Sequence, residues 1–186
     1  MKKILLLVLV CLVSCSSFAQ TKERNQELKS IVGISPIRLW NSLRIKYERV
    51  LNSKFTYGGI LTGYYTNYTN YPGVQLTPII KFYFKEKAPK GFYAQAKILA
   101  GFSQNNSFDS GVDEKQFFTS FGAGIAVGYQ LLWGKDNRWS IDMNVGFKYT
   151  TNAPEPKDDI YCDHVNWHII GPGSIPDGLV SIGYRF

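Results

Sequence analysis

The chain has 186 residues, a length that suggests one domain. Its aromatic content is 15 % although its mean hydropathy is only -0.14, so large apolar side chains alternate with polar ones instead of gathering in long runs. The formal net charge is +7, but no basic run exceeds two residues, which argues against nucleic acid as a partner of this chain. After the N-terminus, no segment has the roughly 20 consecutive apolar residues of a membrane-spanning helix.

The N-terminus has the pattern of a secretory signal peptide. Lys2 and Lys3 precede an apolar run over 4–13 and small residues up to Ala19. We expect a signal peptide over 1–19 and a periplasmic lead over 20–29. The stretch Leu-Val-Ser-Cys at 12–15 also resembles a lipobox, which would make Cys15 a lipidated N-terminus instead. Cleavage before Gln20 would leave one cysteine, so no disulfide within the chain is expected.

The rest of the chain alternates apolar and polar residues with period two, the pattern of β-strands. The alternation predicts eight strands, an even number typical of outer-membrane barrels. We expect them at about 29–37, 42–48, 54–66, 75–85, 92–102, 117–133, 139–150 and 178–186. The turns at 51–53, 86–89 and 134–137 are short, whereas the loops at 66–74, 103–115 and 151–176 are longer. A barrel with short periplasmic turns and long outer loops shows this arrangement, although the connection near 39–41 is also short.

Alternation alone does not say which face points outward. An eight-stranded barrel has room inside only for side chains that fill it, and the Phe, Trp and Ile set would overfill that space. Aromatic residues also cluster near both strand ends, as in the girdles of membrane barrels. The sequence therefore predicts an all-β fold over 30–186, an eight-stranded antiparallel up-and-down transmembrane β-barrel, with its bulky residues facing lipid.

The final stretch, GLVSIGYRF at 178–186, resembles the C-terminal β-signal of Gram-negative outer-membrane proteins. Tyr184 and Phe186 occupy its alternating aromatic positions, although Ser181 stands where glycine is usual. The layout over 30–186 resembles the small OmpA/OmpX-type barrels, and 46–54 resembles the first hairpin of uncharacterised outer-membrane barrel families. The resemblance implies an outer-membrane location, the barrel-assembly machinery and outer-membrane lipid as partners, and a monomer.

The residues predicted to face inward carry a surplus of positive charge. Either they attract anions or they form a filled plug of ion pairs, and we favour the plug because buried charges need partners. The surplus would still need water or anions. The predicted lumen charge network comprises Arg44, Lys46, Glu48, Lys81, Lys97, Asp142, Lys148 and Arg185, with Lys85 as a further inward lysine.

The last long loop combines residue types that bind zinc-like ions. Cys162, His164 and His168 are the candidates, near Asp158, Asp159 and Asp163, but they match no complete ligand set. The same histidines with Ser107 or Ser174 would be the candidates in a lipid-modifying enzyme, and no nucleophile motif supports that role. We therefore expect no metal, no cofactor and no enzymatic activity.

Aromatic residues in the loops are candidates for binding a ligand or partner, or for the interfacial girdle: Tyr64, Tyr65, Tyr68, Tyr71 and Trp167. The predicted function is a structural or adhesive one, or binding through the loops to an unidentified extracellular ligand, without a conducting pore. A lipid-modifying enzyme and a periplasmic soluble barrel or lipoprotein remain the alternatives.

Overall fold

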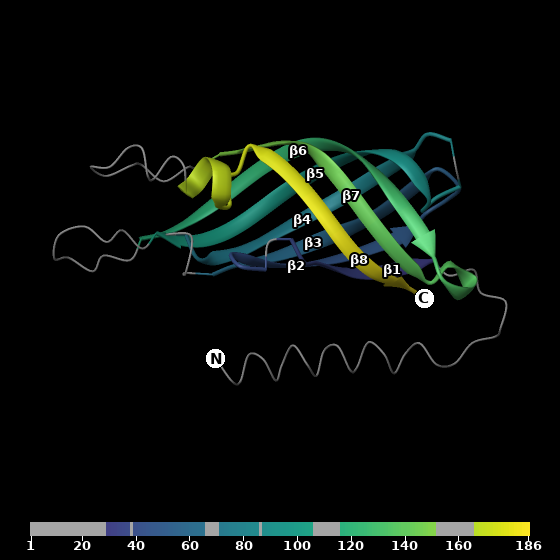
Figure 1. Cartoon of the computed structure of the whole chain (residues 1–186). Coiled ribbons are helices and arrows are strands. Elements are labelled where there is room, and N and C mark those ends of the chain that lie inside the picture. The colour runs from purple at the N-terminus through teal and green to yellow at the C-terminus, as the bar shows by residue number, and fades with distance from the viewer. Residues whose placement is uncertain (1–28, 38, 66–70, 86, 106–115, 152–165) are drawn as a thin grey trace.

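The computed structural model describes residues 29–37, 39–65, 71–85, 87–105, 116–151 and 166–186. These residues form a closed antiparallel barrel of eight strands in which each strand pairs with its neighbour in sequence and β8 pairs with β1 (Figure 1). The strands are β1 Ser30–Ser35, β2 Ser42–Val50, β3 Phe55–Tyr64, β4 Gly73–Tyr83, β5 Gly91–Asn105, β6 Gln116–Trp133, β7 Trp139–Thr150 and β8 Pro176–Arg185. Two short helices, η1 Lys135–Asn137 and η2 Asn166–Ile170, lie between strands. In the described ranges, no helix is both long and apolar enough to cross a membrane.

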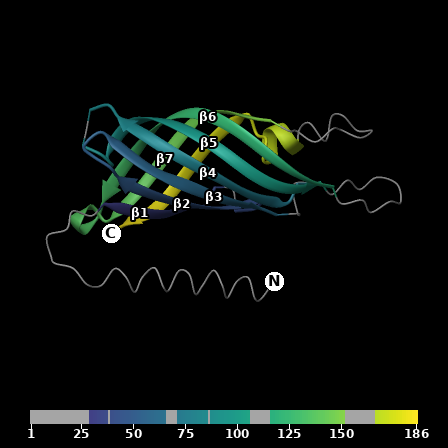
Figure 2. The same ribbon diagram turned by 180° about the vertical axis from the view of Figure 1, so that it is seen from behind.

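The connections sort to the two ends of the barrel. Those joining β2 to β3, β4 to β5 and β6 to β7 lie at the end where β8 finishes, and we call this the turn end (Figures 1 and 2). Helix η2 lies at the opposite end, the loop end, where the described residues of the other connections also lie. The predicted eight strands and their up-and-down order are therefore confirmed.

The predicted end of the fourth strand is wrong, and this changes the facing of one lysine. Strand β4 ends at Tyr83. Phe55, the first residue of β3, pairs with Phe82, and the last pair of β4 and β5 is Tyr83 with Tyr93, although the Phe84 N–H still donates to the Phe92 carbonyl. Lys85 lies beyond the strand and is exposed, so it is not the inward lysine that the alternation predicts.

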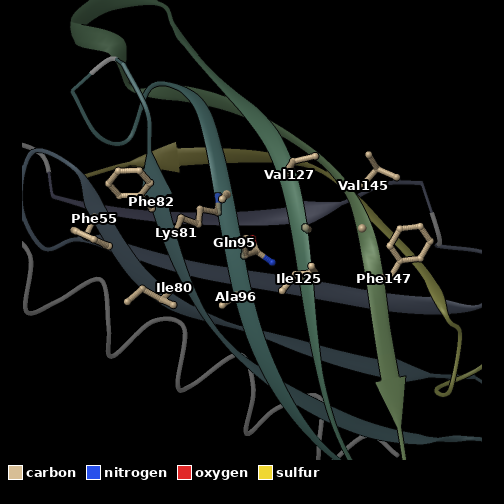
Figure 3. Close-up of a pocket in the computed structure, with 13 residues that line it drawn as sticks. Phe55, Ile80, Lys81, Phe82, Gln95, Ala96, Ile125, Val127, Val145 and Phe147 are labelled. Atoms are coloured by element: carbon tan, nitrogen blue, oxygen red, sulfur yellow. The ribbon is translucent and has the colours of Figure 1, made fainter.

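The predicted facing of the two rows is confirmed by their exposure. Ile125, Val145 and Phe147 on the outer wall are 67–68 % exposed, whereas Lys81 and Asp142 inside are 1 % and 0 % exposed. These outer side chains line a hollow on the outside of β3 to β7 (Figure 3), and its volume is ≈ 480 Å³. The small side chain of Ala96 leaves space in this hollow. The barrel thus encloses its charges and presents its bulky apolar groups outward, opposite to a soluble barrel.

Aromatic side chains pair on the outer surface near both ends of the strands. At the turn end, the rings of Trp133 and Trp139 stack with centroids 6.3 Å apart, and Tyr184 meets Trp139 edge-on at 5.5 Å. At the loop end, Phe102 and Phe117 stack at 5.7 Å. The outer wall therefore carries a group of paired aromatic rings near each end of the strands.

Candidate functional site: the charged interior of the barrel

Two lysines and two carboxylates form a closed square across the turn-end half of the interior. Lys46 Nζ lies 2.9 Å from Glu48 Oε2 and 2.5 Å from Asp142 Oδ2. Lys81 Nζ lies 3.0 Å and 2.7 Å from the same two oxygens. We call these four residues the quartet. Its charges balance, which is the condition under which buried ions are tolerated.

Neutral polar groups complete the hydrogen bonding of the quartet. Tyr93 donates to Asp142 Oδ1 at 2.5 Å, and Thr56 donates to Glu48 Oε1 at 2.7 Å. The Tyr83 hydroxyl lies 2.7 Å from Gln130 Oε1 and 3.0 Å from Glu48. The Lys81 ammonium also lies 4.2 Å from the centre of the Tyr93 ring. Ions and tyrosine rings from β2, β4, β5 and β7 therefore fill this level of the barrel.

A second group of charges lies closer to the loop end. It consists of Arg44, Lys97, Lys148 and Asp177, which we call the basic cluster. Lys97 forms an ion pair with Asp177, and Arg44 Nη1 lies 3.9 Å from Asp177 Oδ1 and donates to the Gly178 carbonyl at 3.0 Å. Lys148 donates to the Pro172 carbonyl at 3.0 Å. Unlike the quartet, this group contains three cations and one anion.

An apolar layer separates the two charged groups. Ile60, Ile79 and Leu179 pack together inside the barrel and are 5–8 % exposed. Along β8, Leu179 lies between Ser181, which pairs with Asp142, and Asp177 of the basic cluster. The quartet and the basic cluster are therefore separate groups rather than one continuous network.

Aromatic side chains cover the interior at the loop end. Trp167 of η2 is 2 % exposed, and its ring centre lies 5.2 Å from those of Tyr71 and Phe118. Gly173 leaves room for this indole, because a Cβ there would lie 2.1 Å from Trp167 Nε1. Tyr64 and Tyr71 are also buried, at 5 % and 1 %. The prediction that these loop aromatics form a recognition surface or a girdle is therefore wrong for Tyr64, Tyr71 and Trp167, whereas Tyr65 is exposed.

The other predicted site residues are dispersed. Arg185 is half-buried at the turn end, where it lines a hollow with Lys29, Val50 and Leu132. Tyr184 and Phe186 are on the outside, 39 % and 47 % exposed. The positions outside the described residues are Tyr68, Ser107, Asp158, Asp159, Cys162, Asp163 and His164.

The remaining candidates for metal or catalytic chemistry are two described residues near the loop end. His168 belongs to η2. Ser174 is buried, and its hydroxyl donates to the Pro176 carbonyl at 2.7 Å. The metal hypothesis, which needs Cys162 and His164, is not tested by the described residues.

The sequence analysis missed one charged member of the interior. Asp177 is the sole carboxylate of the basic cluster, but it was not predicted to face inward, because the expected loop ended at 176 and the expected strand began at 178. Strand β8 begins at Pro176, and its inward row runs through Asp177, Leu179 and Ser181. Extending the alternation two residues back from Leu179 finds Asp177.

Comparisons with known proteins agree with this architecture. A model of the family described as "Protein of unknown function (DUF3575)" matches residues 6–167. No curated protein matches the chain. The crystal structure of the N-terminal β-barrel domain of Pseudomonas aeruginosa OprF is similar, with a TM-score of 0.50 and 10 % sequence identity over 86 % of this chain and 98 % of that chain. The resemblance to small OmpA-type barrels thus holds for the fold, and the chain belongs to the DUF3575 family.

Proposed function

We propose that the protein is a non-conducting β-barrel of the Gram-negative outer membrane that has a structural or adhesive role and holds its loops outside the cell. The observation that carries this proposal is that large apolar side chains lie on the outside of the barrel and charged side chains lie inside it. An outer wall of exposed Ile, Val and Phe is unfavourable in water, by roughly 25 cal/mol per Å² of apolar surface. Contact of the same wall with lipid removes this cost.

The shape of the outer wall supports contact with a bilayer. A tilted strand needs about 9–11 residues to cross the hydrocarbon core, and seven of the eight strands have 9 residues or more. The aromatic zones at both ends have the position of interfacial girdles. The ≈ 480 Å³ hollow is apolar, so acyl chains of outer-membrane lipid would fill it. The closed sheet leaves no strand edge that lipid would have to satisfy.

The filled interior supports a barrel without a pore. The quartet, the layer of Ile60, Ile79 and Leu179, the basic cluster and the Trp167 group lie one after another along the axis. Moving an ion through would require the balanced quartet to separate, and leaving one buried charge without its partner costs about 3–5 kcal/mol. We propose no enzymatic role, and we propose that the barrel acts as a monomer whose outer loops contact an extracellular partner.

Fractionation and conductance test the proposal. We expect the protein in the outer-membrane fraction, with a band whose gel mobility changes on heating, as folded barrels show. The refolded protein should give no stepwise conductance in a planar bilayer. Recovery in the soluble periplasmic fraction would refute the membrane assignment, and regular conductance steps would refute the closed interior.

A further inference from the structure

We propose that the basic cluster binds one small monatomic anion, which would be chloride in the cell. The site lies inside the barrel between the apolar layer and the Trp167 group, and Arg44, Lys97 and Lys148 are its cationic groups. The proposal depends on the interior of the folded barrel and holds whether or not the barrel is in a membrane.

The charge balance of the cluster supports an anion. Arg44, Lys97 and Lys148 are 4–6 % exposed, and Asp177, which pairs with Arg44 and Lys97 and also interacts electrostatically with Lys148, is the sole carboxylate among them. The neighbouring inward groups that line the site are neutral: Ile60, Thr62, Gln75, Thr77 and Leu99. The described residues thus leave two positive charges uncompensated, a state that costs several kcal/mol per buried ion.

The same fold shows what a compensated interior looks like. In the quartet, each lysine touches two carboxylate oxygens, and the charges are equal in number. In the basic cluster, Lys148 donates instead to the neutral Pro172 carbonyl. Among the described residues, the excess of positive charge therefore lies in the basic cluster and not in the quartet.

The site also has room and an unused donor. The charged residues line a cavity of ≈ 20 Å³, which is enough for one particle about the size of water. Arg44 Nε is buried and has no hydrogen-bond partner among the described residues. A buried donor of this kind is expected to meet an acceptor. A monatomic halide is the smallest common anion, so it fits this volume with less movement of the lining side chains than phosphate, sulfate or a carboxylate would need.

A water molecule would fit the same space, but it would leave both excess positive charges uncompensated, whereas one halide would compensate one of them. The two occupants therefore differ in a measurable way. A halide site makes the stability of the barrel depend on halide concentration at constant ionic strength, whereas a water site leaves it unchanged. Ionic strength itself is held constant by exchanging sodium chloride for sodium gluconate, whose anion is too large for the cavity.

The test is the urea unfolding midpoint of the full chain folded in detergent. We expect the midpoint to rise and saturate as chloride or bromide replaces gluconate. Lys148→Met should weaken the apparent halide affinity at least tenfold, while Lys85→Met, which changes an exposed lysine, should leave it unchanged. A midpoint that ignores halide, or an identical response in Lys148→Met, would overturn the proposal.

Crystals soaked in sodium bromide provide a readout that does not depend on a variant folding. We expect an anomalous difference peak within the cavity near Arg44 and Lys148. A full-occupancy water there, with no bromide signal, would overturn the proposal.

Discussion

Tyr93 and Gly128 face each other across β5 and β6, and the phenol of Tyr93 occupies the space that a side chain at position 128 would need. A Cβ there would lie 2.5 Å from the Tyr93 ring and 2.5 Å from the Met143 carbonyl oxygen. Gly128 thereby lets the tyrosine reach Asp142. We expect Gly128→Val to destabilise the barrel by about 1–3 kcal/mol through overpacking, measured by urea unfolding in lipid vesicles. Ala123→Val, on the outer face of the same strand, should change stability little, and equal losses would contradict this packing.

The quartet predicts a strong coupling between Lys46 and Asp142. Asp142→Asn should cost about 3–5 kcal/mol, because it leaves two lysines sharing Glu48 in a buried setting. The double variant Lys46→Gln with Asp142→Asn restores equal numbers of opposite charges. We expect its loss of unfolding free energy to fall short of the sum of the two single losses by roughly 0.5–3 kcal/mol. Strict additivity in this cycle would show that the square of ion pairs does not form.

Neighbouring positions on β7 test the two faces of the wall. Val145 is 67 % exposed and Asn144 is 8 % exposed. Val145→Arg should destabilise the membrane-inserted barrel by about 2–4 kcal/mol if residue 145 lies near the bilayer midplane. Asn144→Ser should cost at most about 1 kcal/mol, the value of its hydrogen bond to Tyr93. Similar effects of both changes on unfolding from lipid vesicles would argue against the proposed lipid contact.

Two tryptophans near the loop end differ in burial and provide a matched pair. Trp167→Ala should cost about 3–5 kcal/mol, because the indole is 2 % exposed and packs on Tyr71 and Phe118. Trp40→Ala should change stability by no more than about 0.5 kcal/mol, because Trp40 is 56 % exposed. Thermal unfolding of both variants in the same detergent measures the difference. A small effect at position 167 would mean that the aromatic cover is absent in solution.

We propose that Phe186 is recognised during barrel assembly, a role that can be tested separately from its contribution to stability. Its backbone N–H and carbonyl bond Ser30 at 2.8 Å and 2.9 Å, while its ring is 47 % exposed. We expect Phe186→Ala to lower the amount of heat-modifiable barrel in cells and to leave the unfolding midpoint of refolded protein nearly unchanged. Leu51→Ala, another exposed side chain at the turn end, should affect neither quantity. An equal loss in both assays would assign Phe186 a purely structural role.

Period-two alternation was sufficient to predict the strands and which residues share a face, because a side chain in a strand has only two directions to choose from. The direction of each face followed from the limited volume inside an eight-stranded barrel. It did not predict where a strand ends, since that depends on the length of its neighbours. Lys85 shows this, as it continues the alternation of β4 beyond the reach of β3. Asp177 shows the converse, because a proline and a glycine around it looked like a loop.

The contacts inside the barrel were harder to predict than its facing. The alternation assigned Lys46 and Asp142 to the same interior. These residues are 96 positions apart in the chain, and their pairing can be predicted only when the register of all the strands between them is known. The burial of Trp167 was not predicted, for a different reason. It lies outside any strand, so no periodicity indicated that its ring turns inward over the barrel.

The strand origins of the quartet have a consequence for cooperativity. Lys46 and Glu48 belong to β2, and Lys81 belongs to β4. A partly formed sheet of β2, β3 and β4 would therefore contain two of these lysines and one carboxylate, so one ammonium group would lack a counter-charge. Asp142 arrives with β7, late in the order of the chain. The balancing carboxylate therefore stabilises the sheet only when nearly all strands have joined it. Partly formed barrels are disfavoured for this reason, and the transition to the closed barrel becomes more cooperative.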